Sequence, residues 1–216
     1  SFEGYKETFA NFYTRNQELS STATNSTRET KKKSSATVEQ LTGFLGGGVT
    51  PKGVQIDQKG RCHCGAVEFR ALGVLVWSGF CHCRNCSRNI GMSPVHLVGV
   101  GNEEQDPVTF TKGADMLLTH TTVGGTFDAS ISRQHCKQCG TILTQGPPEA
   151  SNFRNVHPAN FWIEDGKCCM LPPEYQPMIH HQYENRTFDW HDDLVKYAGF
   201  PKFSPKVDNK GNPIEE

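Results

Sequence analysis

The sequence from residue 54 to residue 171 predicts an all-β domain made of several small antiparallel sheets. Apolar runs in this region are short, they are bounded by Gly, Pro, Asn and Asp, and several alternate between apolar and polar positions. None shows the period of an amphipathic helix, and regularly spaced short strands are typical of all-β folds. We expect strands at residues 66–69, 75–77, 95–100, 108–111, 117–123, 126–132, 141–144 and 161–163.

Residues 1–50 form an N-terminal extension whose composition differs from that of the β domain. Aromatic residues recur at three- and four-residue steps within residues 1–16, which predicts a short helix with an aromatic stripe. This stripe could pack on the chain's own domain or dock a protein partner, and both interpretations stay open. Residues 17–36 are rich in Ser, Thr and Asn and predict a mobile linker, and residues 38–45 predict a short helix. The stripe consists of Phe2, Tyr5, Phe9 and Phe12.

The C-terminal part predicts one more short helix, at residues 192–197. Asp192 and Asp193 suit the positive end of a helix dipole, and Gly199 follows as a stop signal. We expect the β domain to span residues 51–203, followed by a polar tail at 204–216.

Charge and hydropathy exclude two classes of partner. The chain has 22 Lys and Arg residues against 23 Asp and Glu residues, so no overall positive field attracts nucleic acid. No apolar run approaches the length of a membrane span. An odd number of cysteines, 9, and the adjacent pair Cys168 and Cys169 argue against a disulfide framework and favour a reducing compartment. We expect a cytoplasmic protein, or one of an organelle interior if Ser1 is a processed terminus.

Two pairs of cysteines have the spacing of a closed metal site. Side chains two apart on an extended strand point the same way, so Cys62 and Cys64 can aim two thiolates at one ion. Cys136 and Cys139, followed by Gly140, have the spacing of a zinc knuckle. Together they offer four sulfurs, the closed tetrahedral set of structural zinc. Such an ion would clasp an early strand to a late turn, so we expect small sheets clasped by zinc.

A third cluster, Cys81, Cys83 and Cys86, offers only three thiolates. Zinc normally takes four ligands, so a fourth position would be open to water or substrate, as in catalytic sites. Two alternatives stay open. A histidine such as His157, or one of the pair His180 and His181, could close this site. Cys136 and Cys139 could instead join this cluster, which would leave Cys62 and Cys64 as buried thiols.

The three clusters, in this order and spacing, resemble the glutathione-dependent formaldehyde-activating enzyme family, which also includes centromere protein V. The resemblance spans about residues 60–200 and rests on three segments: RCHCGAV from Arg61, CHCRNC from Cys81 and CKQCGT from Cys136. Trp190 to Leu194 are similar to the family's tryptophan and acidic pair. The first fifty residues lie outside the resemblance.

The resemblance implies an all-β fold with two zinc ions. It implies a structural zinc on Cys62, Cys64, Cys136 and Cys139 and a catalytic zinc on Cys81, Cys83 and Cys86. The family's named activity is the condensation of formaldehyde with the thiol of glutathione, in the class of carbon–sulfur lyases. The reaction type carries over better than the substrate, because family members differ in what they act on.

Three thiolates suit this chemistry. They leave a zinc ion with a net charge of about minus one, which makes it a weak Lewis acid toward water. A substrate thiol bound as the fourth ligand would stay deprotonated and attack a small aldehyde held beside it. Arg84 and Arg88 flank the cluster and could meet a substrate carboxylate, although arginines beside a turn are usually only solvated.

A second hypothesis comes from another functional class. The chain could be a non-catalytic zinc-binding subunit or adaptor that docks through the aromatic stripe of residues 1–16. A fourth protein ligand on the Cys81 cluster would favour it. A chromatin role, by analogy with centromere protein V, is disfavoured by the balanced charge.

Overall fold

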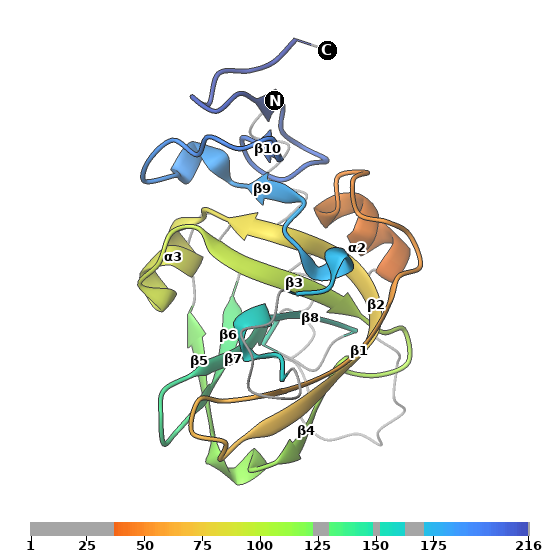
Figure 1. Cartoon of the computed structure of the whole chain (residues 1–216), viewed down its shortest axis with the longest axis vertical. Helices are drawn as coiled ribbons and strands as arrows, with labels where there is room; N and C mark the ends of the chain where they lie inside the picture. The colour runs from red at the N-terminus through yellow and green to blue at the C-terminus, as the bar shows by residue number, and fades with distance from the viewer. Residues whose placement is uncertain (1–36, 123–129, 149–151, 163–170, 216) are drawn as a thin grey trace, which may run out of the picture.

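A computed structural model describes residues 37–122, 130–148, 152–162 and 171–215 of the chain. Most of the regular structure is one mixed sheet in the order β11-β10-β9-β2-β3-β8-β7-β6-β5, with β1 and β4 also paired to β2. Figure 1 shows β10 and the C-terminus at one end of the molecule and β4 at the other. The strands are β1 (Gln55–Arg61), β2 (Glu68–Cys81), β3 (Val95–Gly101), β4 (Val108–Lys112), β5 (Leu117–Thr122), β6 (Ile131–Cys136), β7 (Ile142–Gly146), β8 (Phe153–Val156), β9 (Ile179–His181), β10 (Val195–Tyr197) and β11 (Lys206–Val207).

Helical structure among the described residues is short. Two α-helices, α2 (Val38–Leu45) and α3 (Arg84–Ile90), flank the β2–β3 region (Figure 1). None of the helices in the described ranges is long and apolar enough to cross a membrane. The described ranges also contain four single 3-10 turns: η1 (Ala114–Met116), η2 (Pro158–Asn160), η3 (Pro173–Tyr175) and η4 (Tyr183–Asn185).

Strand β2 organises the sheet. Its first half pairs with β1 and β4, and after a bulge between Leu75 and Trp77 its second half pairs with β3 and β9. A Cβ at Gly79 would lie 2.3 Å from the carbonyl oxygen of Ile179, so only glycine lets the parallel strand β9 approach this closely. This approach brings the C-terminal part of the chain to Cys81, the last residue of β2.

The core has two parts on either side of this bulge. One part packs Phe69, Leu75, Val98 and Leu143 among the strands near β1. The other part packs α2 against Trp77, Leu97 and Ile179 and includes Cys81, Cys83 and Cys86. Because burial of each large apolar side chain contributes about 1.5–3 kcal/mol, these clusters hold the end of β2 rigidly.

Helix α2 confirms the helix predicted at residues 38–45. Thr37 caps its first turn, because its hydroxyl accepts from the Gln40 amide and the Gln40 side chain accepts from the Thr37 amide. Val38, Leu41 and Leu45 form its buried face. The aromatic helix predicted for residues 1–16 and the linker predicted for 17–36 lie outside the described residues.

The mostly-β prediction is confirmed, but the expected division into several small antiparallel sheets is wrong. The described strands form one large sheet with two parallel pairs, β2 with β9 and β9 with β10. The run predicted at 75–77 and the second half of the run predicted at 66–69 belong to the single 14-residue strand β2, which continues through its bulge.

Three further expectations differ from the structure. The helix predicted at 192–197 is wrong, because Val195–Tyr197 forms strand β10 between β9 and β11. Two elements were not predicted from the sequence. They are helix α3, which lies in a region expected to lack helices, and the polar strand β1. Of the strand predicted at 161–163, Phe161 makes an isolated bridge to Gly60, and residue 163 lies outside the described ranges.

Candidate metal centres

Four cysteines converge where two turns meet. Cys62 and Cys64 lie in the turn after β1, and Cys136 and Cys139 lie at the end of β6 and in the turn after it. The four sulfurs all lie within 4.8 Å of one another. Each turn is completed by a glycine with positive φ, Gly65 at 73° and Gly140 at 74°, which lets the chain fold back beneath the sulfurs.

The distances in this group fit a metal and exclude disulfides. Cys62 Sγ lies 3.5 Å from Cys64 Sγ, which in turn lies 3.8 Å from Cys136 Sγ. A disulfide needs about 2.05 Å, whereas zinc–sulfur bonds of about 2.3 Å in a tetrahedron place sulfurs roughly 3.8 Å apart. A hydrogen bond with the Thr141 hydroxyl, at 3.2 Å, lowers the pKa of Cys139 to about 5, which favours the thiolate that a metal requires.

The other group joins the end of a strand to the start of a helix. Cys81 ends β2, Cys83 is the N-cap of α3, and Cys86 lies in the first turn of that helix. The Cys83 sulfur accepts from the Cys86 amide at 3.3 Å, as a capping side chain does, and this bond fixes the two sulfurs on one side of the turn. The three sulfurs lie within 4.8 Å of one another and all three residues are buried.

The surroundings of this group favour a thiolate on Cys86. Hydrogen bonds with Cys81 and Cys83 hold the pKa of Cys86 well below its usual value. The Gln145 amide, which donates to the Cys86 sulfur at 3.3 Å, and the positive charge of Arg133 act in the same direction. Hydrogen bonds with Cys83 and Cys86, together with burial, raise the pKa of Cys81 well above its usual value.

A buried polar chain holds the residue between Cys81 and Cys83. The ring of His82 lies 2.8 Å from that of His180, measured between Nε2 and Nδ1, and His180 Nε2 lies 3.0 Å from Asp192 Oδ2. Asp192 also accepts a short hydrogen bond from the buried Lys196 ammonium. The C-terminal segment thereby anchors the cysteine loop through side chains, in addition to the β2–β9 pairing.

A cleft of about 630 Å³ lies beside the four-cysteine group. Cys62 and Thr141 line one part, and Met92, His96 and His157 line another. His157 is close enough to Cys86 for their charges to interact, and burial lowers its pKa to about 4, so its ring is neutral at pH 7. Its buried Nε2 has no hydrogen-bond partner among the described residues.

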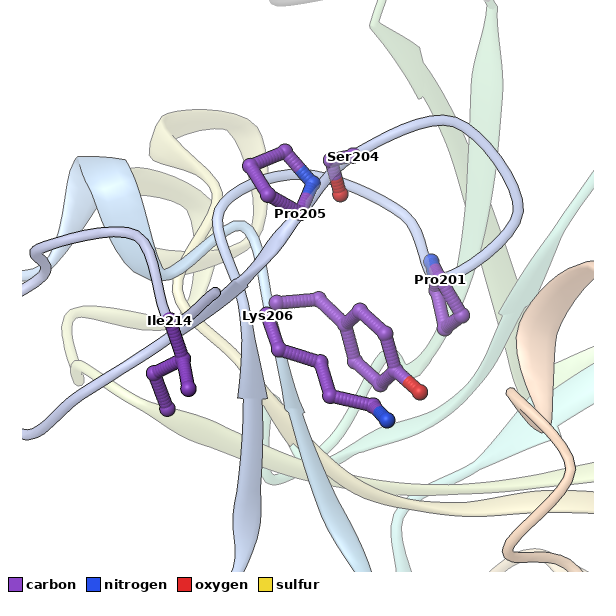
Figure 2. A pocket seen from close by; sticks show the side chains of 6 residues that line it. Pro201, Ser204, Pro205, Lys206 and Ile214 are labelled. Carbon is purple, nitrogen blue, oxygen red and sulfur yellow. The ribbon is translucent and has the colours of Figure 1, made fainter. Parts of the chain in front are cut away.

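A second hollow, of about 420 Å³, lies at the C-terminal end of the sheet (Figure 2). Pro201, Pro205, Lys206 and Ile214 are among its lining residues, with Ser204 and Tyr197. Its described lining includes no cysteine, histidine or acidic residue, so it offers neither metal ligands nor an acid–base pair.

The structure gathers the seven predicted cysteines into two groups. Cys62 and Cys64 lie with Cys136 and Cys139, and Cys81, Cys83 and Cys86 form the other group. The alternative that placed Cys136 and Cys139 with the Cys81 cluster does not occur. Within the described ranges, no histidine or carboxylate joins the three sulfurs at 4.8 Å, and His180 and His181 bond to other groups.

Other residues around the three cysteines went unrecognised in the sequence. Arg84 and Arg88 are exposed on α3, whereas the buried Gln145 on β7 contacts Cys86 and is in turn held by the buried Arg133 on β6. In the sequence, the signal for Arg133 is a charged residue directly after the strand predicted at 126–132. In the structure it lies within β6, most of which is buried or half-buried.

Comparison with known proteins identifies the family. A model of the glutathione-dependent formaldehyde-activating enzyme family matches residues 57–184, more than half of the chain. A search with this chain finds no match among curated protein sequences. A crystal structure of a Rhodobacter sphaeroides protein shares 22% identity over 51% of this chain and 91% of its own, with a TM-score of 0.36. On the family match, this chain belongs to the glutathione-dependent formaldehyde-activating enzyme family.

Proposed function

We propose that this chain is a zinc-dependent carbon–sulfur lyase that condenses a small aldehyde such as formaldehyde with a thiol such as glutathione. Family membership supports the substrate class. The observation that carries the proposal is the unequal number of converging ligands. One group offers four sulfurs, and the other offers three, with no further histidine nitrogen or carboxylate oxygen within 4.8 Å of all three among the described residues. A three-ligand set suits a zinc site that accepts substrate.

The four-cysteine group is proposed as the structural site. Its members come from two turns that are 72 residues apart in sequence, as the Cys64–Cys136 contact shows. Closing a loop of this length costs chain entropy, and one ion held by both turns offsets that cost. Four protein sulfurs complete a tetrahedron, so no position remains for a substrate.

The three-cysteine group is proposed as the reactive site, with Cys81, Cys83 and Cys86 as its metal ligands. Zinc held there would supply a fourth coordination position at which the substrate thiol loses its proton and stays nucleophilic. The protein's own part is chiefly positional. The N-cap geometry of Cys83, the end of β2 and the His82 chain fix where the sulfurs converge, which keeps the open side in one direction.

The 630 Å³ cleft is the proposed route for both substrates. His157 lines it and interacts with Cys86, so it connects the cleft to the reactive group. Its neutral ring can donate or accept one hydrogen bond at the buried Nε2, which suits the oxygen of an aldehyde or of the hydroxymethyl product. His157 is therefore the proposed substrate-orienting residue.

The reaction itself is the test. Formation of S-(hydroxymethyl)glutathione is fast without enzyme, so the exchange rate between free and adduct glutathione is followed by NMR with and without the zinc-loaded protein. We expect acceleration by the natural chain and none above buffer by Cys83→Ser. Serine is a good N-cap, so this variant keeps the start of α3 and loses the sulfur alone. A natural chain that leaves the exchange rate unchanged at full zinc loading would rule out this activity.

A further inference from the structure

Arg133 is a fully buried charge with unusual partners. It lies on β6 with a relative exposure of 0%. Its guanidinium donates to Gln145 Oε1 at 3.1 Å, to Thr122 Oγ1 at 3.0 Å and to Asn85 Oδ1 at 2.9 Å. A fourth contact, to the Asn85 carbonyl oxygen, is 3.5 Å long. All of these acceptors are neutral.

The other buried cations of the described chain have carboxylate partners. Arg154 pairs with Asp106 at 2.8 Å, and Lys196 pairs with Asp192. No carboxylate within the described ranges forms an ion pair with Arg133. A buried charge is costly unless an opposite charge compensates it, and neutral hydrogen bonds recover only part of that cost. Among the described groups near Arg133, the cysteine cluster that Gln145 contacts is the candidate source of a balancing negative charge.

The bonds of Arg133 point to that group. Gln145, its cross-strand partner in the β6–β7 ladder, accepts from Arg133 Nε with one end of its amide and donates to Cys86 Sγ with the other. Asn85, which accepts from Arg133 Nη2, immediately precedes Cys86. The guanidinium is thus connected to Cys86 through one intervening residue in two ways, by way of Gln145 and by way of Asn85.

We propose that Arg133 is a positioning residue that balances the negative charge of the three-cysteine site and makes it select an anionic fourth ligand. This inference rests on the proposed function, because it assumes a metal on Cys81, Cys83 and Cys86. Three thiolates on a divalent ion carry a net charge of about minus one, and a fourth thiolate raises this to about minus two. In a buried site, a nearby fixed positive charge lowers the cost of that second negative charge but does nothing for a neutral ligand.

The test compares a neutral and an anionic ligand on cobalt-substituted protein. Cobalt(II) replaces zinc at both groups, and its visible absorption reports binding of 2-mercaptoethanol, which binds as a thiolate, and of imidazole, which binds neutral. For Arg133→Met we expect the affinity for the thiolate to fall about tenfold, which equals about 1.4 kcal/mol, with imidazole affinity within about twofold of the natural chain. Arg133→Lys keeps the charge and should recover most of the thiolate affinity.

Two further variants separate charge from packing. Arg154→Met removes the other largely buried arginine, whose ion pair is with Asp106, and should leave both ligand affinities unchanged. Gln145→Glu keeps the shape and pairs directly with Arg133, so it should fold even if Arg133→Met does not. It cancels the positive charge and removes the donor to Cys86, and we expect a thiolate loss of at least about tenfold.

The outcomes are distinguishable. If the natural cobalt protein binds no thiol at the three-cysteine site, the proposed function fails and this inference fails with it. If the natural protein binds thiolate, but Arg133→Met or Gln145→Glu binds thiolate and imidazole in the natural ratio, the role of Arg133 is overturned while the proposed function stands. Equal losses for both ligands would also overturn it, because they would show a packing effect.

Discussion

The two cysteine groups differ in what surrounds them more than in the sulfurs themselves. The four-cysteine group lies in two glycine-completed turns, with Cys64 exposed and Cys139 half-buried. The three-cysteine group is wholly buried between a strand end and a helix N-terminus, and buried polar side chains reach it from β6, β7 and the C-terminal segment. On the proposed roles, a site that only holds the fold together needs sulfurs and tight turns, whereas a site that binds a reactive thiol also needs its charge and orientation fixed.

The largest expected difference between the groups concerns folding. Cys136→Ser removes one of four ligands, and because structural zinc contributes about 10–16 kcal/mol to folding in small domains, we expect little folded protein. Cys83→Ser should fold with a melting temperature within a few degrees of the natural chain, because serine keeps the cap of α3. Soluble yield and thermal unfolding by circular dichroism measure both. Equal behaviour of the two variants would contradict the division of roles.

Acid should destabilise the side of the molecule near the three cysteines. Burial lowers the pKa of His181 to about 3, whereas the unfolded chain keeps a value near 6.5. Above pH 6.5 both states are neutral and His181 has no effect. Below it only the unfolded state takes up the proton, so stability falls by about 1.4 kcal/mol per pH unit until pH 3.

Urea unfolding of the zinc-loaded protein at pH 7.5 and 5.5 measures this effect. In His181→Gln the amide can still donate to the Leu45 carbonyl, which the His181 ring approaches at 2.6 Å. We expect this variant to lose about 1 kcal/mol less than the natural chain over the same pH interval. An identical loss of unfolding free energy in both proteins would show that folding does not lower the pKa of His181.

The polar side chains that hold His82, between Cys81 and Cys83, are a further source of stability on this side of the molecule. Asp192→Asn leaves the buried Lys196 without its counter-charge and weakens the contact with His180. We expect a loss of about 2 kcal/mol in unfolding free energy, and faster metal loss to a chelator from the three-cysteine group alone. Asp189→Asn is the matched control, because Asp189 pairs with Arg186 from an exposed position, where an ion pair contributes little. Equal effects of the two substitutions would show that the contacts of Asp192 with His180 and Lys196 do not support the three-cysteine group.

The smallest expected effect belongs to the four-cysteine group. Thr141 accepts from the His63 amide at 3.1 Å and shares a hydrogen bond with Cys139. Thr141→Val removes both, and we expect about 1 kcal/mol less stability with thiol binding at the other group unchanged. Thr109→Val, on the surface of β4, serves as the control for adding valine to a strand. A change in thiol binding would show that the two groups are coupled.

The sequence was most informative where chemistry depends on local spacing. The C-x-C and C-x-x-C intervals predicted that the cysteines within each short motif lie together, because two or three residues fix the relative direction of side chains. Which motifs combine stayed open, because the contact between Cys64 and Cys136 joins distant parts of the chain. The helix at 38–45 was likewise predicted from its apolar spacing and from the glycines that end it. In both cases the signal lies within a few residues of the structure that it specifies.

Features set by distant contacts could not be predicted in this way. Residues 195–197 carry a helix-like pattern, but pairing with β9 and β11 determines their strand conformation. Helix α3 has no apolar period and is nucleated by Cys83 as its cap. Arg133 and Gln145 gain their meaning only from the β6–β7 register, which places them opposite each other beside Cys86.

Cadmium NMR of the metal-loaded protein tests the central claim most directly, because each cadmium ion reports its own ligand set. The claim is that this chain holds one saturated metal and one that accepts an outside thiol. We predict two resonances, of which glutathione shifts one, and that one is the resonance missing from Cys83→Ser. Two resonances that both ignore glutathione, or a single resonance at full loading, would contradict it.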